Sequence, residues 1–328
     1  MGETTNGKSH LGLKVAGVIY LSFAFTLSFY HVQTIDRPFW QGRSEFHQGV
    51  INGDFNAPYQ YRILSPWLAE VPSIIVEKAL GLAPGKQAAM AREFFYLLQR
   101  LIATFLLFIV FHLYLENWFT SEIAFSGTLI LAGIHIFTYR SYFYQPDSPL
   151  HLLFLTLGAY FMSRGEYKGW LYPLTVVGSL TRETFGLIVP LHLAFFGFKK
   201  QTLKHSFGLL GVWLSIQLLL RGYFGMRPPF PARPLVTNFY ESAWPLFLFS
   251  LMWFIPLIYF TRLPATLRRM ILLFAPPLII ANFMFGKVEE TRMFLDLAIF
   301  IIPATLFALL SGRIATPMEN AITVDHTV

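Results

Sequence analysis

The sequence predicts an all-α membrane protein that crosses the bilayer many times. Hydrophobic residues make up 55% of the 328 residues and charged residues only 13%, whereas a soluble domain carries about 25% charged residues. Apolar stretches of membrane-spanning length recur along the chain, from near residue 12 to near residue 310. Because the bilayer core offers no water to pair backbone N–H and C=O groups, these stretches are expected to form helices.

The apolar runs and their flanks predict about ten membrane segments, some of them short or broken. These lie near 12–31, 93–115, 121–138, 148–163, 169–181, 183–198, 206–222, 243–261, 270–285 and 293–311. We expect the whole chain, 1–328, to form one transmembrane domain. Residues 1–11 and 312–328 are then cytoplasmic and residues 32–91 form the longest outer loop, an orientation that puts the clustered Lys and Arg residues inside.

The stretch 169–198 sets the orientation of everything that follows it. It is too long for one ordinary span and too short for two spans of about 20 residues each. Two short helices that meet at Thr181-Arg182-Glu183-Thr184 keep the basic clusters inside and leave Arg182 and Glu183 below the outer surface. Ionisable groups at that depth usually serve function, and a buried Arg–Glu pair is rarely retained for stability.

The first outer loop contains a segment with the apolar spacing of a helix. The pattern runs through Ile63, Leu64, Trp67, Leu68, Val71, Ile74 and Ile75, with Glu70, Glu77 and Lys78 between or after them. This pattern is typical of an amphipathic helix that lies in the plane of the membrane interface.

Polar residues in the predicted outer loops are the candidate site residues. They are Asp36, Asp54, Tyr59, Tyr61, Arg62, Asp147, Arg182, Glu183, Lys287, Glu289, Glu290 and Arg292. Several have a simpler interpretation. Asp147 can be a helix N-cap, Arg292 can pair with Asp296 one turn further on, and Tyr59 and Tyr61 can be interfacial anchors, as can Trp67.

Net charge, cysteine content and histidine spacing limit the classes of partner and metal site that the chain can have. The net charge of +7 comes from basic residues scattered among apolar spans, so contact with membrane lipid is expected and a nucleic-acid partner is not. The absence of cysteine excludes disulfides and thiolate metal sites. His31, His112 and His135 lack the spacing of metal ligands and are interpreted as packing residues.

The layout resembles the GT-C superfamily of integral-membrane glycosyltransferases, and some short motifs are similar to those of bacterial members of uncharacterised subfamilies. Asp36 stands about five residues after the first span, and Tyr59-Gln60-Tyr61-Arg62 precedes the amphipathic helix. The elements Thr181–Thr184 and Glu289–Arg292 complete the resemblance. It implies a polyprenyl-phosphate sugar donor and an acceptor on the periplasmic or luminal side of an inner or plasma membrane.

The chemistry of such a transfer assigns roles to the candidates. A carboxylate must take the proton of the acceptor hydroxyl, for which Asp36 is the first choice and Asp54 the second. The lipid phosphate needs fixed positive charge, for which guanidinium groups are well suited. Arg62, Arg182, Lys287 and Arg292 would clamp the phosphate, Glu183 and Glu289 would orient them or bind sugar hydroxyls, Tyr59 and Tyr61 would stack on the sugar, and Asp147 and Glu290 complete the substrate-binding set.

The first outer loop has no Asp-x-Asp, the pattern of the oligosaccharyltransferase branch, so no cofactor or metal residue is assigned and a divalent metal is left open.

Two other functions fit part of the pattern. A transporter or flippase would also use broken helices with charged residues near mid-membrane, but no internal repeat relates two halves of this chain. A non-catalytic scaffold would leave Arg182 and Glu183 without a role.

Overall fold

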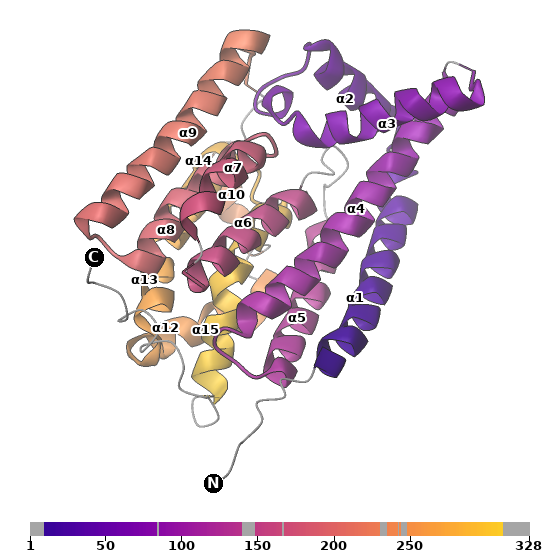
Figure 1. Ribbon diagram of the computed structural model, residues 1–328. Coiled ribbons are helices and arrows are strands. Elements are labelled where there is room, and N and C mark those ends of the chain that lie inside the picture. The colour runs from indigo at the N-terminus through magenta and orange to yellow at the C-terminus, as the bar shows by residue number, and fades with distance from the viewer. Residues whose placement is uncertain are drawn as a thin grey trace.

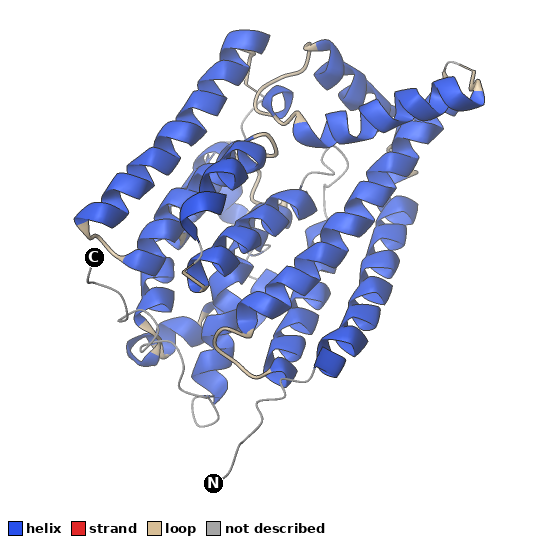
Figure 2. Ribbon diagram, viewed as in Figure 1, coloured by secondary structure: helices blue, strands red, loops and turns tan. Residues whose placement is uncertain are grey.

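The chain is an all-α membrane protein (Figures 1 and 2). The computed structural model describes residues 10–83, 85–139, 148–165, 167–229, 235–241, 243 and 248–310. In this part of the chain there is no extended strand, and six helices are long and apolar enough to cross a membrane. They are Gly12–Asp36, Lys86–Leu115, Ser121–Tyr139, Lys200–Phe224, Ala265–Phe285 and Thr291–Leu310.

The expected count of ten membrane segments is not confirmed. Helices α6 (Ser148–Ser163), α7 (Tyr167–Ser179) and α8 (Ile188–Phe196) have 16, 13 and 9 residues. At about 1.5 Å per residue each is shorter than the bilayer core of about 30 Å. The described part of the segment expected at 243–261 contains only short turns of helix, among them α12 (Ile255–Ile258). An apolar run shows that a segment avoids water, but it does not show that the segment is one full-length helix.

The segment between α1 and α4, which the sequence predicts to be the first outer loop, folds into a cap at one end of the molecule. Helix α1 (His10–His31) continues into a π-helical turn, η1 (Val32–Asp36), and is followed by α2 (Trp40–Asn52), η2 (Tyr59–Tyr61) and α3 (Leu64–Leu80). Helices α2 and α3 lie across the ends of the long helices, whereas α1 begins and α15 ends at the opposite end (Figure 1). We refer to the former as the capped end.

Helix α3 has the amphipathic face that the sequence predicts. Trp67, Leu68 and Val71 are between 45% and 47% exposed, while Ala69 and Ser73 on the other side are fully buried. The small buried residues let α3 pack closely on α4 (Lys86–Leu115). The exposed apolar face fits a helix that rests in the membrane interface.

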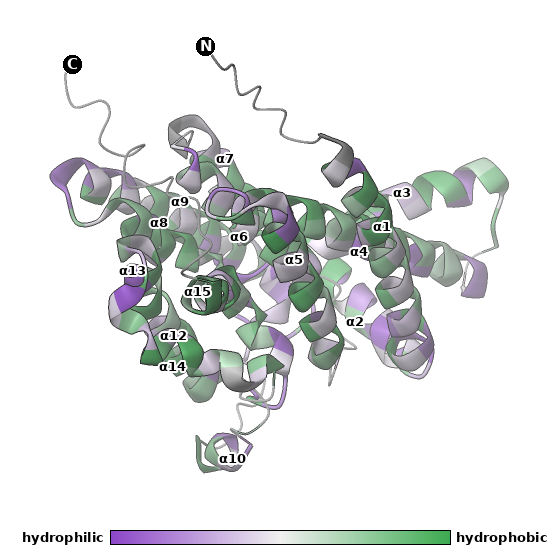
Figure 3. Cartoon of the chain, turned by 90° about the horizontal axis from the view of Figure 1, so that it is seen from below, coloured by the Kyte–Doolittle hydropathy of each residue, from purple (hydrophilic) through white to green (hydrophobic). Residues whose placement is uncertain are grey.

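The remaining helices and turns include both core and peripheral elements. They are α5 (Ser121–Ile136), η3 (Phe137–Tyr139), α9 (Lys200–Phe224), α10 (Leu235–Tyr240), η5 (Ser250–Trp253), η6 (Phe260–Arg262), α13 (Ala265–Leu273), α14 (Ala275–Phe285), η7 (Thr291–Leu297) and α15 (Ala298–Leu310). In the apolar stretch formed by η7 and α15, 78% of the residues are buried, against 17% in that of α9, so α15 is a core helix and α9 a peripheral one. Hydrophobic residues predominate along the long helices (Figure 3), and many of their large hydrophobic side chains are exposed, as expected where lipid replaces water.

Specific hydrogen bonds stabilise the break between α7 and α8, and the prediction of two short helices here is confirmed. Arg182 has extended backbone angles (φ −154°, ψ 146°) between the end of α7 and the 3₁₀ turn η4 (Glu183–Leu187). The carbonyl groups freed by the break accept hydrogen bonds from Leu64 N (3.1 Å to Leu180 O), Trp213 Nε1 (2.9 Å to Glu183 O) and Gln217 Nε2 (3.2 Å to Ser179 O). The broken helix therefore leaves these backbone groups paired.

Candidate functional site

A cavity of about 410 Å³ opens where η2, the α7–α8 break and the loop after α14 meet. Its polar lining consists of Tyr59, Arg62, Arg182, Glu183, Thr184, Asn282, Lys287, Glu290 and Arg292, and its apolar lining of Ala57, Pro58, Pro229, Ala281, Phe285 and Met293. These residues come from four parts of the chain: the segment around η2, the α7–α8 break, the segment after α9, and α14 with the residues that follow it. The volume lies in the range of small-molecule sites.

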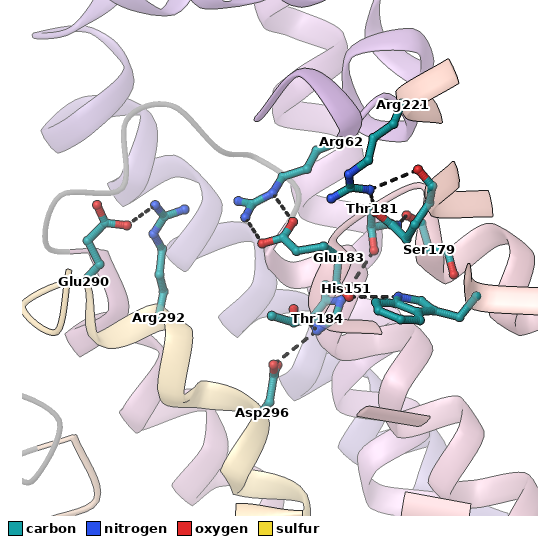
Figure 4. A network of polar contacts seen from close by, with 12 residues as sticks. Arg62, His151, Ser179, Thr181, Glu183, Thr184, Arg221, Glu290, Arg292 and Asp296 are labelled. Atoms are coloured by element: carbon teal, nitrogen blue, oxygen red, sulfur yellow. Dashed lines mark hydrogen bonds and ion pairs between the residues drawn. The ribbon is translucent and has the colours of Figure 1, made fainter. Parts of the chain in front are cut away.

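Arg62 and Glu183 form one wall of the cavity. Arg62 Nε donates to Glu183 Oε2 over 2.9 Å, and Arg62 Nη2 donates to the other carboxylate oxygen, so the contact is bidentate (Figure 4). The Arg62 guanidinium also lies 5.1 Å from the centre of the Tyr59 ring. The pair joins the residue after η2 to the first residue of η4 and holds both side chains in one orientation.

Glu290 and Arg292 form a second wall, to the left of the first pair in Figure 4. Arg292 Nη2 donates to Glu290 Oε2, and both residues are buried. The loop that carries them is fixed to α14 because Asn282 Nδ2 donates to Met293 O over 2.9 Å. It is also fixed to α10, because Val288 N donates to Asn238 Oδ1 over 3.2 Å, while the Asn238 amide donates to Phe283 O and Gly286 O at the end of α14.

Arg182 differs from these paired arginines. Its side chain lines the cavity although the residue is only 3% exposed. Among the described residues its side chain has no hydrogen-bond or ion-pair partner, and its Nε is buried. The nearest charge that it influences is the Glu183 carboxylate, which is already bonded to Arg62. Arg182 therefore supplies a buried positive charge for which the described protein offers no counter-ion of its own.

The Tyr59 hydroxyl can act as a donor in this cavity. Burial, and next the nearby Glu290 carboxylate, raise the pKa of Tyr59 above its ordinary value. The phenol therefore keeps its proton throughout the neutral range and can donate it in a hydrogen bond to an anion or to a sugar oxygen.

The two predicted bases lie outside the cavity lining. Asp36 is buried at the end of η1, and its carboxylate accepts hydrogen bonds from Arg43 Nη1 and Arg100 Nη1, each over 2.7 Å. The Asp54 side chain is 74% exposed and lies 3.8 Å from Arg227 Nη1. The assignment of a base to either residue stays a prediction, and the structure places neither among the arginines of the cavity.

The other predicted residues divide in the same way. Tyr59, Arg62, Arg182, Glu183, Lys287, Glu290 and Arg292 line the cavity, whereas Tyr61 and Glu289 do not. The Tyr61 hydroxyl donates to Gly225 O and accepts from Arg227 N, so it ties the end of α9 to the capped end. Asp147 lies outside the described residues.

A buried polar cluster beneath the cavity was not predicted. His151 of α6 lies 3.1 Å from Asp296 and 3.4 Å from the hydroxyls of Thr181 and Thr184 (Figure 4). In the sequence His151 stands in an apolar run without ligand spacing, and Asp296 is spaced to pair with Arg292. No sequence signal joins these two residues, which are 145 positions apart.

Two of the histidines interpreted as packing residues also have polar neighbours. His112 Nδ1 lies 2.7 Å from the Tyr20 hydroxyl, and His31 Nδ1 lies 3.2 Å from Asp36. His31, His112 and His135 are all buried, in agreement with their interpretation as packing residues.

The lining as a whole combines fixed cations with apolar surface. Among the described residues no group of three or more His, Asp or Glu side chains is placed to hold a metal ion. Comparison with protein-family models, curated proteins and solved structures finds no match. The chemistry of the cavity, which suits an anion joined to an apolar group, therefore carries the functional argument.

Proposed function

We propose that this chain is a membrane glycosyltransferase of the GT-C type. It moves a sugar from a polyprenyl-phosphate-linked donor to an acceptor on the periplasmic or luminal side of an inner or plasma membrane. The observation that carries the proposal is Arg182, a buried guanidinium that lines the cavity without a partner among the described residues.

An anionic ligand accounts for the position of Arg182. Placing an arginine within a membrane costs about 2.5–3.5 kcal/mol on insertion scales, so a compensating group is needed. A phosphate fits the planar fork of a guanidinium better than it fits a point charge. Arg62 and Arg292 stand on the two walls, each oriented by a carboxylate, and can therefore contact the same anion without first losing side-chain freedom.

The apolar part of the cavity supports a lipid-linked donor over a soluble one. Phe285 lines the cavity and is nevertheless 75% exposed, and Ala281 lines it one turn earlier on α14. Ile280 and Met284 continue the exposed apolar surface of the same helix. A hydrocarbon chain can lie along this face of α14 in the bilayer while its phosphate reaches Arg182.

The reaction also needs a proton acceptor. The acceptor oxygen bonds to the anomeric carbon as the bond from that carbon to the phosphate oxygen breaks, and the lipid phosphate leaves with the electron pair. The acceptor's hydroxyl proton passes to a carboxylate. Because Glu183 and Glu290 are the carboxylates of the described lining, we add Glu290 to Asp36 and Asp54 as a candidate base. Glu183 is fully engaged by Arg62 and is better suited to orientation.

The broken α7–α8 segment favours one alternative, a transporter or flippase for a lipid-linked or other anionic substrate. Ionisable residues at breaks in short helices are also how transporters bind charged substrates. The two functions differ in outcome, because a transferase cleaves the sugar–phosphate bond and a flippase moves the intact molecule.

The test uses the full-length chain in liposomes that contain a polyprenyl-phosphate sugar with a labelled sugar. We expect loss of label from the lipid fraction in the presence of acceptor extract, and no loss with Arg182→Gln. Arg37→Gln is the matched control, since Arg37 is exposed and bonds to Gln33 outside the cavity. Passage of intact donor across the bilayer would establish the transporter instead. If the label stays on the lipid and the donor does not cross the bilayer, both functions are refuted.

A further inference from the structure

His151 is a fully buried histidine of α6 that touches two other segments of the chain. It projects from α6, its Nε2 lies 3.1 Å from Asp296 Oδ2 in η7, and its Nδ1 lies 3.4 Å from Thr181 Oγ1 at the α7–α8 break. Thr184 Oγ1 lies 3.4 Å from Nε2. Figure 4 shows this cluster directly below the Arg62–Glu183 pair.

The contacts of His151 lie in two of the segments that carry the buried arginines of the cavity, those of Arg182 and Arg292. Thr181 directly precedes Arg182, and Asp296 follows Arg292 by four residues in η7. Neither Thr181, Asp296 nor His151 is part of the cavity lining, whereas Thr184, the third polar contact of His151, is. One imidazole ring therefore connects the two walls.

We infer that His151 and Asp296 are positioning residues of the phosphate site, which set the spacing between the wall that carries Arg182 and the wall that carries Arg292. The inference rests on the proposed function, because it concerns the affinity of the same cavity for the phosphate of the donor. His151 acts through Thr181 and Asp296 and does not touch the ligand.

An imidazole ring is well suited to this role. It places two polar nitrogens on opposite sides of a rigid, flat ring, so it can hold a hydroxyl on one side and a carboxylate on the other. The Thr181 hydroxyl donates its proton to Gly178 O over 2.5 Å, and its oxygen lies 3.4 Å from His151 Nδ1. The Phe185 ring packs edge-on against the imidazole at 5.8 Å between centroids, which limits rotation of the ring.

The spacing matters because a site with two guanidiniums depends on precise geometry. Groups that bind one anion from opposite walls must be held to within about 0.5 Å by the residues behind them. Removing His151 would leave the Asp296 carboxylate buried without this partner, and η7 would shift to regain one. A change of spacing weakens binding even when every residue of the cavity lining is retained.

The test measures binding of farnesyl phosphate, a short polyprenyl phosphate, to the full-length chain in nanodiscs, with farnesol as the probe that lacks the anion. Variants are His151→Gln, Thr181→Val and Thr181→Ser. The matched controls are His192→Gln, a buried histidine in α8 bonded to Ser206, and Thr156→Val, a buried threonine of α6 whose hydroxyl donates to Leu152 O. Melting temperatures are measured on all variants, so that affinity is compared below unfolding.

We expect His151→Gln and Thr181→Val to weaken farnesyl phosphate binding about tenfold, the usual effect of residues that orient a binding group. Thr181→Ser keeps the hydroxyl and should restore most of the affinity, while both controls should bind within twofold of the parent chain. If His151→Gln does not fold, the comparison of Thr181→Val with Thr181→Ser decides. Equal losses in those two variants would attribute the effect to packing and overturn the inference.

The outcomes separate this inference from the proposed function. Unchanged affinity in His151→Gln and Thr181→Val, together with a loss in Arg182→Gln, would overturn the positioning role and leave the phosphate site intact. A parent chain that binds farnesyl phosphate no better than farnesol would refute the phosphate site and the positioning role with it.

Discussion

Arg62 and Glu183 lie 121 positions apart in the sequence and form a bidentate ion pair in the cavity wall. The pair joins the first outer loop to the α7–α8 break, two segments that no local pattern connects. It also holds Glu183 turned toward Arg62, so that the neighbouring Arg182 keeps its charge for another partner. A structural tie and a binding site thus share adjacent residues.

Breaking this pair from one side should cost stability. Glu183→Gln removes the carboxylate that bonds the buried Arg62 guanidinium, for which the expected loss is about 3 kcal/mol, the lower end of the range for buried pairs. The lower end applies because the Glu183 side chain is 29% exposed and therefore partly solvated. Thermal unfolding in detergent measures the loss. Glu45→Gln, at an exposed site of α2, is the control, and a variant as stable as the parent chain would contradict the expectation.

A catalytic role and a structural role of Asp36 predict different results for the variant Asp36→Asn. If Asp36 takes the acceptor proton, Asp36→Asn lowers turnover about 10²–10⁴-fold with nearly normal folding and donor binding. The contacts of Asp36 with Arg43 and Arg100 favour another result, a lower melting temperature, because two buried guanidiniums lose their shared carboxylate. We expect the melting temperature to fall.

Glu290→Gln provides the complementary measurement. Because Glu290 lines the cavity, we expect a loss of turnover of about 10²–10⁴-fold if it is the base. Asp54→Asn, at a largely exposed side chain, should leave turnover unchanged. Full activity in Glu290→Gln together with inactive but well-folded Asp36→Asn would return the role to Asp36.

Orientation can be tested without background, because the chain has no cysteine. Gln48 in α2, Gln201 at the start of α9 and Met226 just after α9 are exposed positions for single cysteines. A membrane-impermeant maleimide should label positions 48 and 226 from outside intact cells and position 201 only after permeabilisation. Labelling of position 201 from outside would place the cavity on the inner side and contradict the predicted topology.

The sequence predicts those features of the fold and of the candidate site that depend on the polarity of single residues. Arginine within an apolar run is costly, so Arg182 and Glu183 could be recognised as site residues before any contact was known. The amphipathic spacing around Trp67 likewise predicts α3. The number of full-length spans could not be obtained in the same way, because hydropathy does not distinguish a short buried helix such as α6 from a spanning one.

Pairing between distant residues could not be predicted. Asp36 looks like an available carboxylate in the sequence, and only the fold brings Arg100, 64 positions away, against it. Asp296 is spaced to pair with Arg292 but lies beside His151, because η7 is a 3₁₀ turn in which residues four apart do not share one face. Ion pairs of this kind depend on tertiary contacts and leave no trace in local spacing.

Arg182 gives the sharpest distinction between a binding site and a scaffold. A guanidinium that binds phosphate by its planar fork is not replaced by lysine, so Arg182→Lys as well as Arg182→Gln should weaken farnesyl phosphate binding at least tenfold. Arg182→Gln should leave the melting temperature within a few degrees of the parent, because this side chain has no described partner to lose. A scaffold reverses this order: Arg182→Leu would be neutral or stabilising, and no ligand affinity would change. Arg37→Lys, at an exposed site outside the cavity, controls for altered surface charge in both measurements. If Arg182→Gln unfolds the protein at ordinary temperature while farnesyl phosphate fails to protect the parent chain from heat, the residue is structural and the phosphate site is wrong.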